Sequence, residues 1–455
     1  MDDSVMDEGR AAAVWRTSLA EYGQGLRAGR FTAEATLRGV LARIRDHAAL
    51  DAFTFVDADA ALAAARGVDA LLAGRSDLGP LMGVPIAVKD LYAAEGMPLT
   101  AGSRVDVSDL VPCEGTIVRA VKRAGGIIVG KTRTTEFAFG TFNPSHPTPR
   151  NPCDAAVHRM PGGSSAGSAV AQAAGLCAIA FGSDTGGSVR QPAGLCGVAG
   201  FKASVGRLPM DGVFPLSPTF DSPGWFARDA ADLAVVWEVL AGERVPAPRP
   251  VDRLVLGRPD AYFFDDLDPD VARAIEAAER RLVDAGARIV PVTLPPLDDV
   301  TAAYGAFLSA ELVAFLGRAR VEANLARMDP VVADRIAPGL TLSADAFLAM
   351  RARYAALACE AHGALAGVDA LFTPTSPRVA APVDVHRDPA KAAAWSKDTL
   401  RLTRPGNLLG LCGVSLPIGH LARSLPVGLQ LLASHGSDAS LLAVARVVEA
   451  VVAAP

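Results

Sequence analysis

One order of elements repeats along this chain: a helical stretch, a glycine, and a short run of apolar, often β-branched residues. Residues 118–124 have a helical pattern that ends at a pair of glycines, and residues 127–129 are then typical of a buried strand. Further on, a helix is predicted to begin at Asp268 followed by proline and to end at Gly286, with a strand over 288–292. Helices that alternate with strands in this way predict an α/β fold.

The same patterns organise the rest of the chain. Apolar positions recur at helical spacing over 33–47 and 57–73, and residues 84–88 are typical of a buried strand. The proline-rich residues 245–250 are expected to connect the two halves across the surface. Residues 300–370 are predicted to be mostly helical, a peripheral layer that could shape a substrate entrance.

Composition excludes several classes of function. The 455 residues are 50% hydrophobic and 20% charged, with a net charge of −5, and no basic stripe that would follow a nucleic acid backbone. No stretch approaches the roughly 20 uncharged apolar residues of a membrane helix. The acidic residues 1–4 do not resemble a signal peptide, so a soluble cytoplasmic protein without nucleic acid or membrane partners is expected.

The metal-ligating residue types are scattered. The six cysteines form no C-x-x-C pair and are expected to be free thiols, and the seven histidines include no H-E-x-x-H motif. We therefore expect neither a metal nor another cofactor.

Two segments rich in glycine and serine are the strongest chemical signal in the chain. They are residues 162–168, GGSSAGS, and residues 182–188, GSDTGGS. Small residues let the backbone approach a ligand closely, and exposed N–H groups in such turns can stabilise an anion. A serine at the end of a Gly-Gly turn can therefore be a nucleophile beside an oxyanion hole.

Two other motif matches are weaker. Residues 125–132, GGIIVGKT, fit the P-loop pattern, but a helix precedes them and the interior favours a strand, so Lys131 is interpreted as an end-of-strand lysine. Residues 163–167, GSSAG, fit the nucleophile elbow of α/β-hydrolases, with Ser165 as the nucleophile and a later histidine as the base. That elbow must follow a buried strand, whereas the residues before it are typical of a loop. It is kept as an alternative.

Several motifs together resemble the amidase signature family. They are residues 83–90, GVPIAVKD, residues 160–168, MPGGSSAGS, the glycine-rich run from 182 to 194, residues 196–202, CGVAGFK, and residues 426–430, PVGLQ. The resemblance implies one amidase signature domain over residues 1–455, an α/β/α sandwich with a large mixed central sheet. Its core motifs lie at 80–230 and 403–431, and 245–395 form a variable, mostly helical substrate-shaping region.

The resemblance also implies the catalytic residues. Ser188 would be the nucleophile, Ser164 the bridging serine after a cis peptide bond with Gly163, and Lys89 the base. A lysine can act as a base only when it is neutral, which burial after a strand can achieve by lowering its pKa.

Other residues would support this acyl transfer. The backbone N–H groups of residues 185–188 would stabilise the oxyanion. The residues assigned to the oxyanion and substrate sites are Thr185, Gly186, Gly187, Ala138, Phe139 and Gly140. The residues assigned structural roles are Ser165, Asp184 and Arg190.

The substrate is predicted less sharply than the reaction. Phe139, with Trp225 and Trp395, favours a small uncharged or aryl amide, and carbamates and esters share the same carbonyl geometry, so a urethanase activity is a further expectation. The glutaminase subunit of a tRNA-dependent amidotransferase is an alternative, but Leu400 stands where that branch would place an acid. A catalytically silent binding protein on this fold is disfavoured because Lys89, Ser164 and Ser188 are all present. A homodimer is the default expectation for an enzyme of this size.

Overall fold

The computed structural model describes Val14 and residues 17–420 and 425–452, without the side chains of 298–302, 419 and 420. The acidic N-terminal residues lie outside this range. Within it, no helix is long and apolar enough to cross a bilayer.

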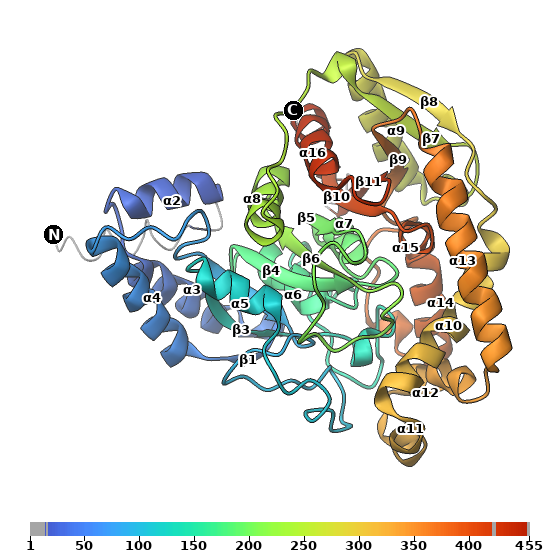
Figure 1. The fold of residues 1–455 in the computed structure, drawn as a ribbon, viewed down its shortest axis with the longest axis horizontal. Helices are drawn as coiled ribbons and strands as arrows, with labels where there is room; N and C mark the ends of the chain where they lie inside the picture. Colours follow the sequence, from blue (N-terminus) through green and yellow to red (C-terminus); the bar gives the residue numbers. More distant parts are fainter. Residues whose placement is uncertain (1–13, 15–16, 421–424, 453–455) are drawn as a thin grey trace.

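Within the described residues, one sheet of eleven strands runs through both halves of the chain, in the order β1-β3-β2-β4-β6-β5-β10-β11-β9-β7-β8 (Figure 1). It is mixed: β2 is parallel to β3 and β4, β7 is parallel to β8 and β9, and the remaining pairs are antiparallel. The strands are β1 (Phe53–Val56), β2 (Pro85–Lys89), β3 (Ile127–Thr132), β4 (Ile179–Asp184), β5 (Ala199–Lys202), β6 (Ser222–Ala227), β7 (Val255–Pro259), β8 (Arg288–Val292), β9 (Ala370–Pro374), β10 (Cys412–His420) and β11 (Pro426–Ala433).

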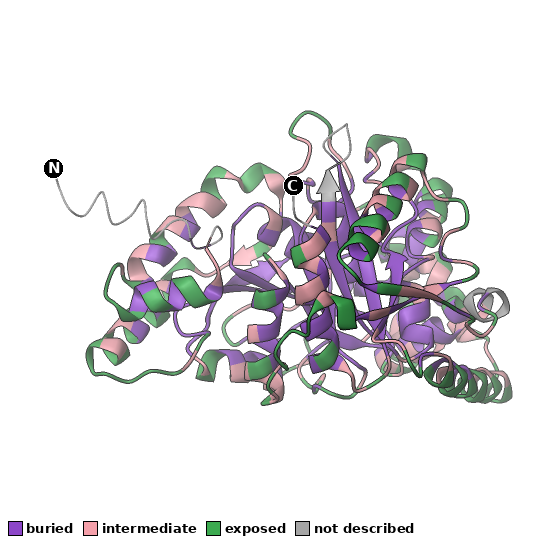
Figure 2. Ribbon diagram, turned by 90° about the horizontal axis from the view of Figure 1, so that it is seen from above, coloured by how far each residue is buried: buried purple, intermediate pink, exposed green. Residues whose placement is uncertain are grey.

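Helices cover both faces of this sheet, and its strands form the buried middle layer (Figure 2). Helices α6 and α7 pack against each other and the central strands, while α16 packs against α8, α9 and strands β10 and β11. The helices are α2 (Leu19–Arg27), α3 (Ala33–Asp46), α4 (Ala58–Ala73), α5 (Thr116–Arg123), α6 (Ala166–Ala173), α7 (Arg190–Cys196), α8 (Ala230–Ala241), α9 (Pro269–Asp284), α10 (Asp298–Leu316), α11 (Arg318–Asn324), α12 (Pro330–Ile336), α13 (Ala344–Ala364), α14 (Pro389–Thr399), α15 (Arg404–Leu408) and α16 (Asp438–Val452). The expected α/β/α sandwich with a mixed central sheet is confirmed.

The helix–glycine–strand order is confirmed where the sequence predicted it. Helix α5 ends before Gly125, whose φ of 77° is the left-handed conformation that glycine adopts without strain, and β3 follows. Pro269 opens α9, and β8 covers the predicted residues 288–292. The proline-rich residues 246–250 are exposed, as a surface connection requires.

Residues 245–395, predicted to be mostly helical, also contain β7, β8 and β9, which complete one end of the sheet; the sequence predicted β8 but not β7 or β9. Residues 300–370 are helical, as expected, and supply most of α10 together with α11, α12 and α13. Strands β7 and β9 are short, and β9 is buried throughout, so no alternation of apolar and polar residues marked it.

The sheet positions the chemistry. Strands β2 and β4 are parallel neighbours, so their carboxyl ends meet at one edge, where Lys89 and Asp184 are the last residues. The two glycine- and serine-rich segments then lead into α6 and α7 at this edge. Open α/β sheets bind ligands outside the carboxyl ends of their strands.

Candidate active site

Lys89 ends β2 with its side chain fully buried. Its Nζ donates hydrogen bonds to Ser164 Oγ at 2.7 Å and to Ser183 Oγ at 2.9 Å. Burial lowers the pKa of Lys89 to about 7, although the negative charges of Asp221 and Asp184 act in the opposite direction. A lysine with this pKa is partly neutral at pH 7, so its lone pair can accept a proton. Ser183 is a partner that the sequence analysis did not name.

Ser164 lies in the turn that leads into α6, and its peptide bond with Gly163 is cis, as the resemblance implied. The Gly163 N–H donates to Gln191 Oε1 at 3.0 Å, and the Thr135 N–H donates to the Ser164 carbonyl at 3.2 Å. A Cβ at position 163 would lie 2.7 Å from the Thr141 carbonyl oxygen, so only glycine fits there. The backbone around Ser164 is therefore held from several sides.

Ser188 lies in the turn between β4 and α7 and lines a cavity. The Ser165 N–H donates to the Ser188 carbonyl at 3.2 Å, which brings the two glycine- and serine-rich segments together. Among the hydrogen bonds of the described residues, none engages Ser188 Oγ, so this hydroxyl is free to meet a ligand in the cavity. A proton path from Ser188 through Ser164 to Lys89 is part of the proposal below.

A buried ion pair fixes the turn that carries Ser188. Arg190 donates to Asp184 through Nε at 3.0 Å and through Nη2 at 2.8 Å, and both side chains are fully buried. Burial alone would raise the pKa of Asp184, but the charge of Arg190 and its hydrogen bonds hold it well below its usual range. The supporting roles expected for Asp184 and Arg190 agree with this geometry.

Arg190 also ties the C-terminal segment to the site. Its Nη1 donates to the Thr403 carbonyl at 2.8 Å and to Gln430 Oε1 at 2.7 Å, and its Nη2 donates to Asn407 Oδ1 at 2.6 Å. One guanidinium thus joins the end of β4 to α15 and β11, which are more than 200 residues away in the chain.

Of the four backbone N–H groups predicted as oxyanion donors, at residues 185–188, one is already occupied within the protein. The Gly187 N–H donates to Asp184 Oδ1 at 2.9 Å, so it is not available to a substrate. Gly187 is also absent from the cavity lining, which includes Thr185, Gly186 and Ser188. This correction could not be read from the sequence, because it depends on where the carboxylate of Asp184 points.

The three remaining donors sit on a fixed backbone. The Tyr304 hydroxyl donates to the Thr185 carbonyl, the Thr185 hydroxyl donates to Asp221 Oδ1 at 2.5 Å, and the Thr403 hydroxyl donates to the Gly186 carbonyl at 2.9 Å. Burial raises the pKa of Asp221 to about 6, against the hydrogen bonds that it accepts. Neither Tyr304 nor Asp221 belongs to a recognised motif, and no local pattern pointed to them.

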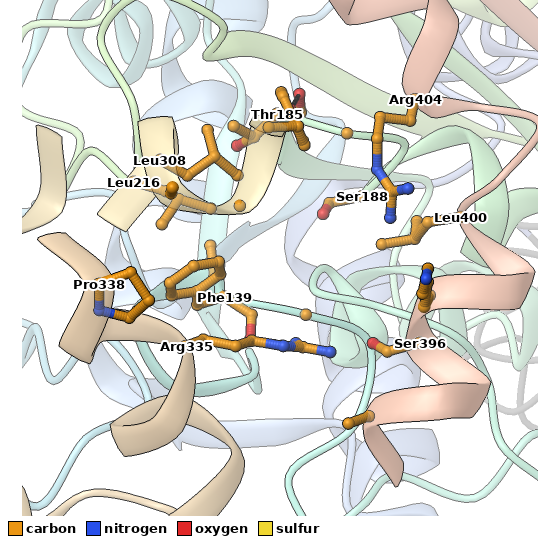
Figure 3. A pocket seen from close by; sticks show the side chains of 18 residues that line it. Phe139, Thr185, Ser188, Leu216, Leu308, Arg335, Pro338, Ser396, Leu400 and Arg404 are labelled. Carbon is orange, nitrogen blue, oxygen red and sulfur yellow. Dashed lines mark hydrogen bonds between the residues drawn. The ribbon is translucent and has the colours of Figure 1, made fainter. Parts of the chain in front are cut away.

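The cavity in front of Ser188 has a volume of about 590 Å³, within the range typical of small-molecule sites (Figure 3). Ala138, Phe139 and Gly140, which were expected in the substrate site, all line it, and Figure 3 shows the ring of Phe139 at its wall. The lining residues are Ala138, Phe139, Gly140, Thr185, Gly186, Ser188, Leu216, Tyr304, Gly305, Ala306, Leu308, Arg335, Pro338, Ala393, Ser396, Lys397, Leu400 and Arg404.

The two tryptophans expected near the substrate lie elsewhere. Trp225 is fully buried in the sheet, with its ring centroid 6.0 Å from that of Phe181 and 4.8 Å from that of Phe201. Trp395 packs in a separate small cluster with Phe142 and Met160. Neither lines the cavity, so of the three aromatic residues expected to favour an aryl substrate, Phe139 alone is in a position to contact it.

The two weaker motif matches have structural explanations. Ser165 is fully buried, and its hydroxyl bonds only the main chain of Ser183, at 3.3 and 3.4 Å; no histidine of the described residues lines the cavity. The nucleophile-elbow alternative therefore lacks both an exposed nucleophile and a base. Lys131 lies inside β3, fully buried, and pairs with Asp90 at 2.7 Å, so residues 125–132 are a helix–strand junction and not a phosphate-binding loop.

Three cations line the cavity that the sequence analysis did not name: Arg335, Lys397 and Arg404. Arg335 lies in the variable region 245–395, and Lys397 and Arg404 lie outside each of the quoted motifs. An isolated basic residue in such a position gives no signal of a site. Over the described residues, no cluster of histidine, cysteine, aspartate and glutamate has the geometry to hold a metal ion.

Comparisons with known proteins extend over nearly the whole chain. The family model described as Amidase matches residues 35–442, which include the whole site. The 2-amino-5-chloromuconic acid deaminase of Comamonas testosteroni is 39% identical over 447 residues, covering 96% of each chain. A glutamyl-tRNA(Gln) amidotransferase subunit of Koribacter versatilis is 34% identical, covering 89% of this chain and 92% of its own. A crystal structure of an amidase superimposes with a TM-score of 0.87 at 33% identity, covering 95% of this chain and 99% of that one.

Proposed function

The chain belongs to the amidase family and is an amidohydrolase that acts on C–N amide bonds, and from that premise we propose that it cleaves a small amide through an acyl-enzyme on Ser188. The observation that carries this proposal is the 2.7 Å hydrogen bond between Lys89 and Ser164 in a fully buried setting. This bond joins Lys89, whose pKa is lowered, to Ser164, and the N–H of the next residue, Ser165, donates to the Ser188 carbonyl.

The proposed reaction has two halves. Neutral Lys89 accepts a proton from Ser164, Ser164 accepts the proton of Ser188, and Ser188 Oγ bonds to the carbonyl carbon. The C–N bond then breaks, and the leaving nitrogen takes a proton back through the same relay. Water adds to the ester carbon in the second half, releases the acid, and restores the Ser188 hydroxyl.

The oxyanion formed in both halves would lie against the N–H groups of Thr185, Gly186 and Ser188. A single donor of this kind contributes about 3 kcal/mol to the transition state where it has been measured. The buried contacts from Tyr304, Asp221 and Thr403 would keep these donors in place before the substrate arrives.

The substrate is proposed to be a small molecule that fits the cavity. The relative from Comamonas testosteroni is named a deaminase, which supports release of ammonia from the substrate. Carbamates and esters present the same carbonyl to Ser188 and are proposed as side substrates.

Glutaminase activity is the second candidate, favoured by the identity with the amidotransferase relative. Leu400 lines the cavity where that branch would place an acid, and none of the described residues that line it is acidic. The amine of glutamine would therefore have no partner.

The test compares anilide, carbamate and ester substrates that release a chromogenic amine or alcohol, and primary amides with detection of ammonia. Ser188→Ala and Lys89→Ala are expected to abolish turnover of every substrate that the wild type cleaves. Lys122→Ala, at an exposed lysine paired with Glu114, is the matched control and is expected to keep full activity. Turnover that survives Ser188→Ala but not Ser165→Ala would overturn the assignment and restore the nucleophile-elbow alternative.

A further inference from the structure

The charged residues that line the cavity are all positive. Arg335, Lys397 and Arg404 line it, and none of its eighteen described lining residues is an aspartate or glutamate. Lys397 is exposed at the rim, whereas both arginines are partly buried. A pocket with this lining concentrates positive potential in front of Ser188.

The two arginines reach the cavity from different elements. Arg335 comes from α12 and Arg404 is the first residue of α15, and Figure 3 shows the Arg404 guanidinium beside Ser188 and the Arg335 side chain extending across the same cavity toward Ser396. Arg335 Nη1 donates to the Phe139 carbonyl at 2.9 Å, which fixes the plane of its guanidinium. The Arg404 guanidinium lies 5.6 Å from the Tyr304 ring centroid. Both groups are thus positioned without a substrate.

Neither arginine has an acidic partner among the ion pairs of the described residues. Two other buried cations do have one, because Arg190 pairs with Asp184 and Lys131 with Asp90, whereas the buried Lys202 donates to the carbonyl oxygens of Ala203 and Leu411. In addition, the Arg404 Nε is buried and has no hydrogen-bond acceptor within the described chain. Buried charges are ordinarily paired, so two unpaired guanidinium groups that face one cavity indicate a missing anion.

Burial also penalises the charge of these groups. It lowers the pKa of Arg335 to about 10, with a further contribution from the charge of Arg404, and it lowers the pKa of Arg404. The carboxylate of Asp329, whose charge acts in the opposite direction on Arg335, accepts hydrogen bonds from Ser145 and Val331. An anion in the cavity would offset this penalty at both arginines.

We propose that this cavity binds the carboxylate of its substrate between Arg335 and Arg404, so that the enzyme cleaves the amide of a small dicarboxylic acid monoamide. This inference rests on the proposed function, since it assigns the part of the substrate that Ser188 does not attack. Arginine is suited to the role because its planar group donates two parallel hydrogen bonds to a carboxylate.

The same lining excludes an ammonium group near the carboxylate. A free amino acid amide such as glutamine carries both charges, and its ammonium would lie among three cations with no acid to accept it. The proposed substrate is therefore an anion without a positive charge. This requirement separates the site from that of a glutaminase.

Three substrates of nearly equal size test the inference: glutaramate, pentanamide and L-glutamine. Pentanamide replaces the carboxylate with a methyl group, and L-glutamine adds an ammonium to glutaramate. The charge-assisted hydrogen bonds of one carboxylate predict a kcat/KM for glutaramate at least about 100-fold above that for pentanamide. L-Glutamine is expected to be at least about 10-fold poorer than glutaramate. Succinamate and adipamate in the same assay give the preferred chain length.

Arginine variants assign the effect to residues. Arg335→Gln and Arg404→Gln are each expected to lower kcat/KM for glutaramate about 10-fold or more, mainly through KM, and to lower that for pentanamide by a clearly smaller factor, so that the ratio of the two kcat/KM values falls. Arg387→Gln, at an exposed arginine outside the cavity, is the matched control. A folding defect would lower kcat/KM for both substrates by the same factor, so the ratio of the two kcat/KM values reports carboxylate recognition alone.

A binding measurement separates this inference from the proposed function. Titration calorimetry of glutarate with Ser188→Ala is expected to show binding that each arginine variant weakens, whether or not any amide is turned over. Hydrolysis of pentanamide as efficient as that of glutaramate, or glutarate binding unchanged in both arginine variants, would overturn carboxylate recognition while leaving the Ser188 chemistry intact. Glutarate binding without hydrolysis of any amide would support the anion site and refute the proposed function.

Discussion

Replacing Lys89 by methionine should change how the stability of the protein depends on pH. Burial lowers the pKa of Lys89 from 10.5 to about 7. Between these two values the unfolded chain holds a proton that the folded protein does not, so the free energy of unfolding rises with pH, by about 1.4 kcal/mol per pH unit. At pH 7 the burial of Lys89 therefore lowers the free energy of unfolding by about 4 kcal/mol, and this cost disappears above pH 10.5.

Lys89→Met has no such proton, so its stability lacks this slope. We expect the free energy of unfolding of the wild type, relative to that of the variant, to rise by about 3 kcal/mol between about pH 7.5 and about pH 9.5. The lost hydrogen bonds to Ser164 and Ser183 cost the variant the same amount at each pH and cancel from the comparison.

The measurement is urea-induced unfolding of both proteins at half-unit steps across this range. Lys122→Met, at an exposed lysine, is the control and should run parallel to the wild type. A difference between wild type and Lys89→Met that stays constant with pH would show that Lys89 is charged in the folded protein, and the proposed base would be lost with it.

The same geometry makes three further predictions. The kcat/KM should fall below pH 7 along a limb with its midpoint at about 7, about tenfold lower at pH 6 than on the plateau, because protonated Lys89 cannot accept a proton; a flat profile from about pH 5 to about pH 8 would contradict this. Asp184→Asn should lower the free energy of unfolding by about 3–5 kcal/mol, since it leaves the buried Arg190 charge unpaired, and chemical denaturation would refute it by showing less than about 1 kcal/mol. Gly187→Ala should reduce both the free energy of unfolding and kcat, because the φ of residue 187 is 121° and the new Cβ would lie 1.8 Å from Thr403 Oγ1. The double variant with Thr403→Ala should recover part of the lost stability but not all of it, because the strained φ remains. Full activity in Gly187→Ala would argue against this turn as the catalytic one.

Local patterns were sufficient for much of the fold. The helices over 33–46 and 58–73 and the strands at 85–89 and 288–292 lie where periodicity and glycine placed them, because each of these segments has one apolar face or is apolar throughout. Strands β7 and β9 were missed. They join the sheet through neighbours that are distant in the chain, and short buried strands have no alternation to recognise.

The residues of the candidate site also fall into those that the sequence could identify and those that it could not. Lys89, Ser164 and Ser188 could be named as candidates from sequence because they stand in short motifs that resemble those of the amidase signature family. Ser183, Asp221 and Tyr304 could not, since their importance comes only from the atoms they meet across the fold.

By itself the sequence determined the α/β class, because helical periodicity and glycine placement are local properties of the chain, and its resemblance to the amidase signature family indicated the reaction type and the candidate catalytic residues. Only the tertiary structure decided that Gly187 points its N–H at Asp184, that Trp225 lies in the core, and that Arg335 and Arg404 line the same cavity as Ser188. The charge of a cavity is a sum over residues from distant segments, and no local pattern records which of them the fold will bring together.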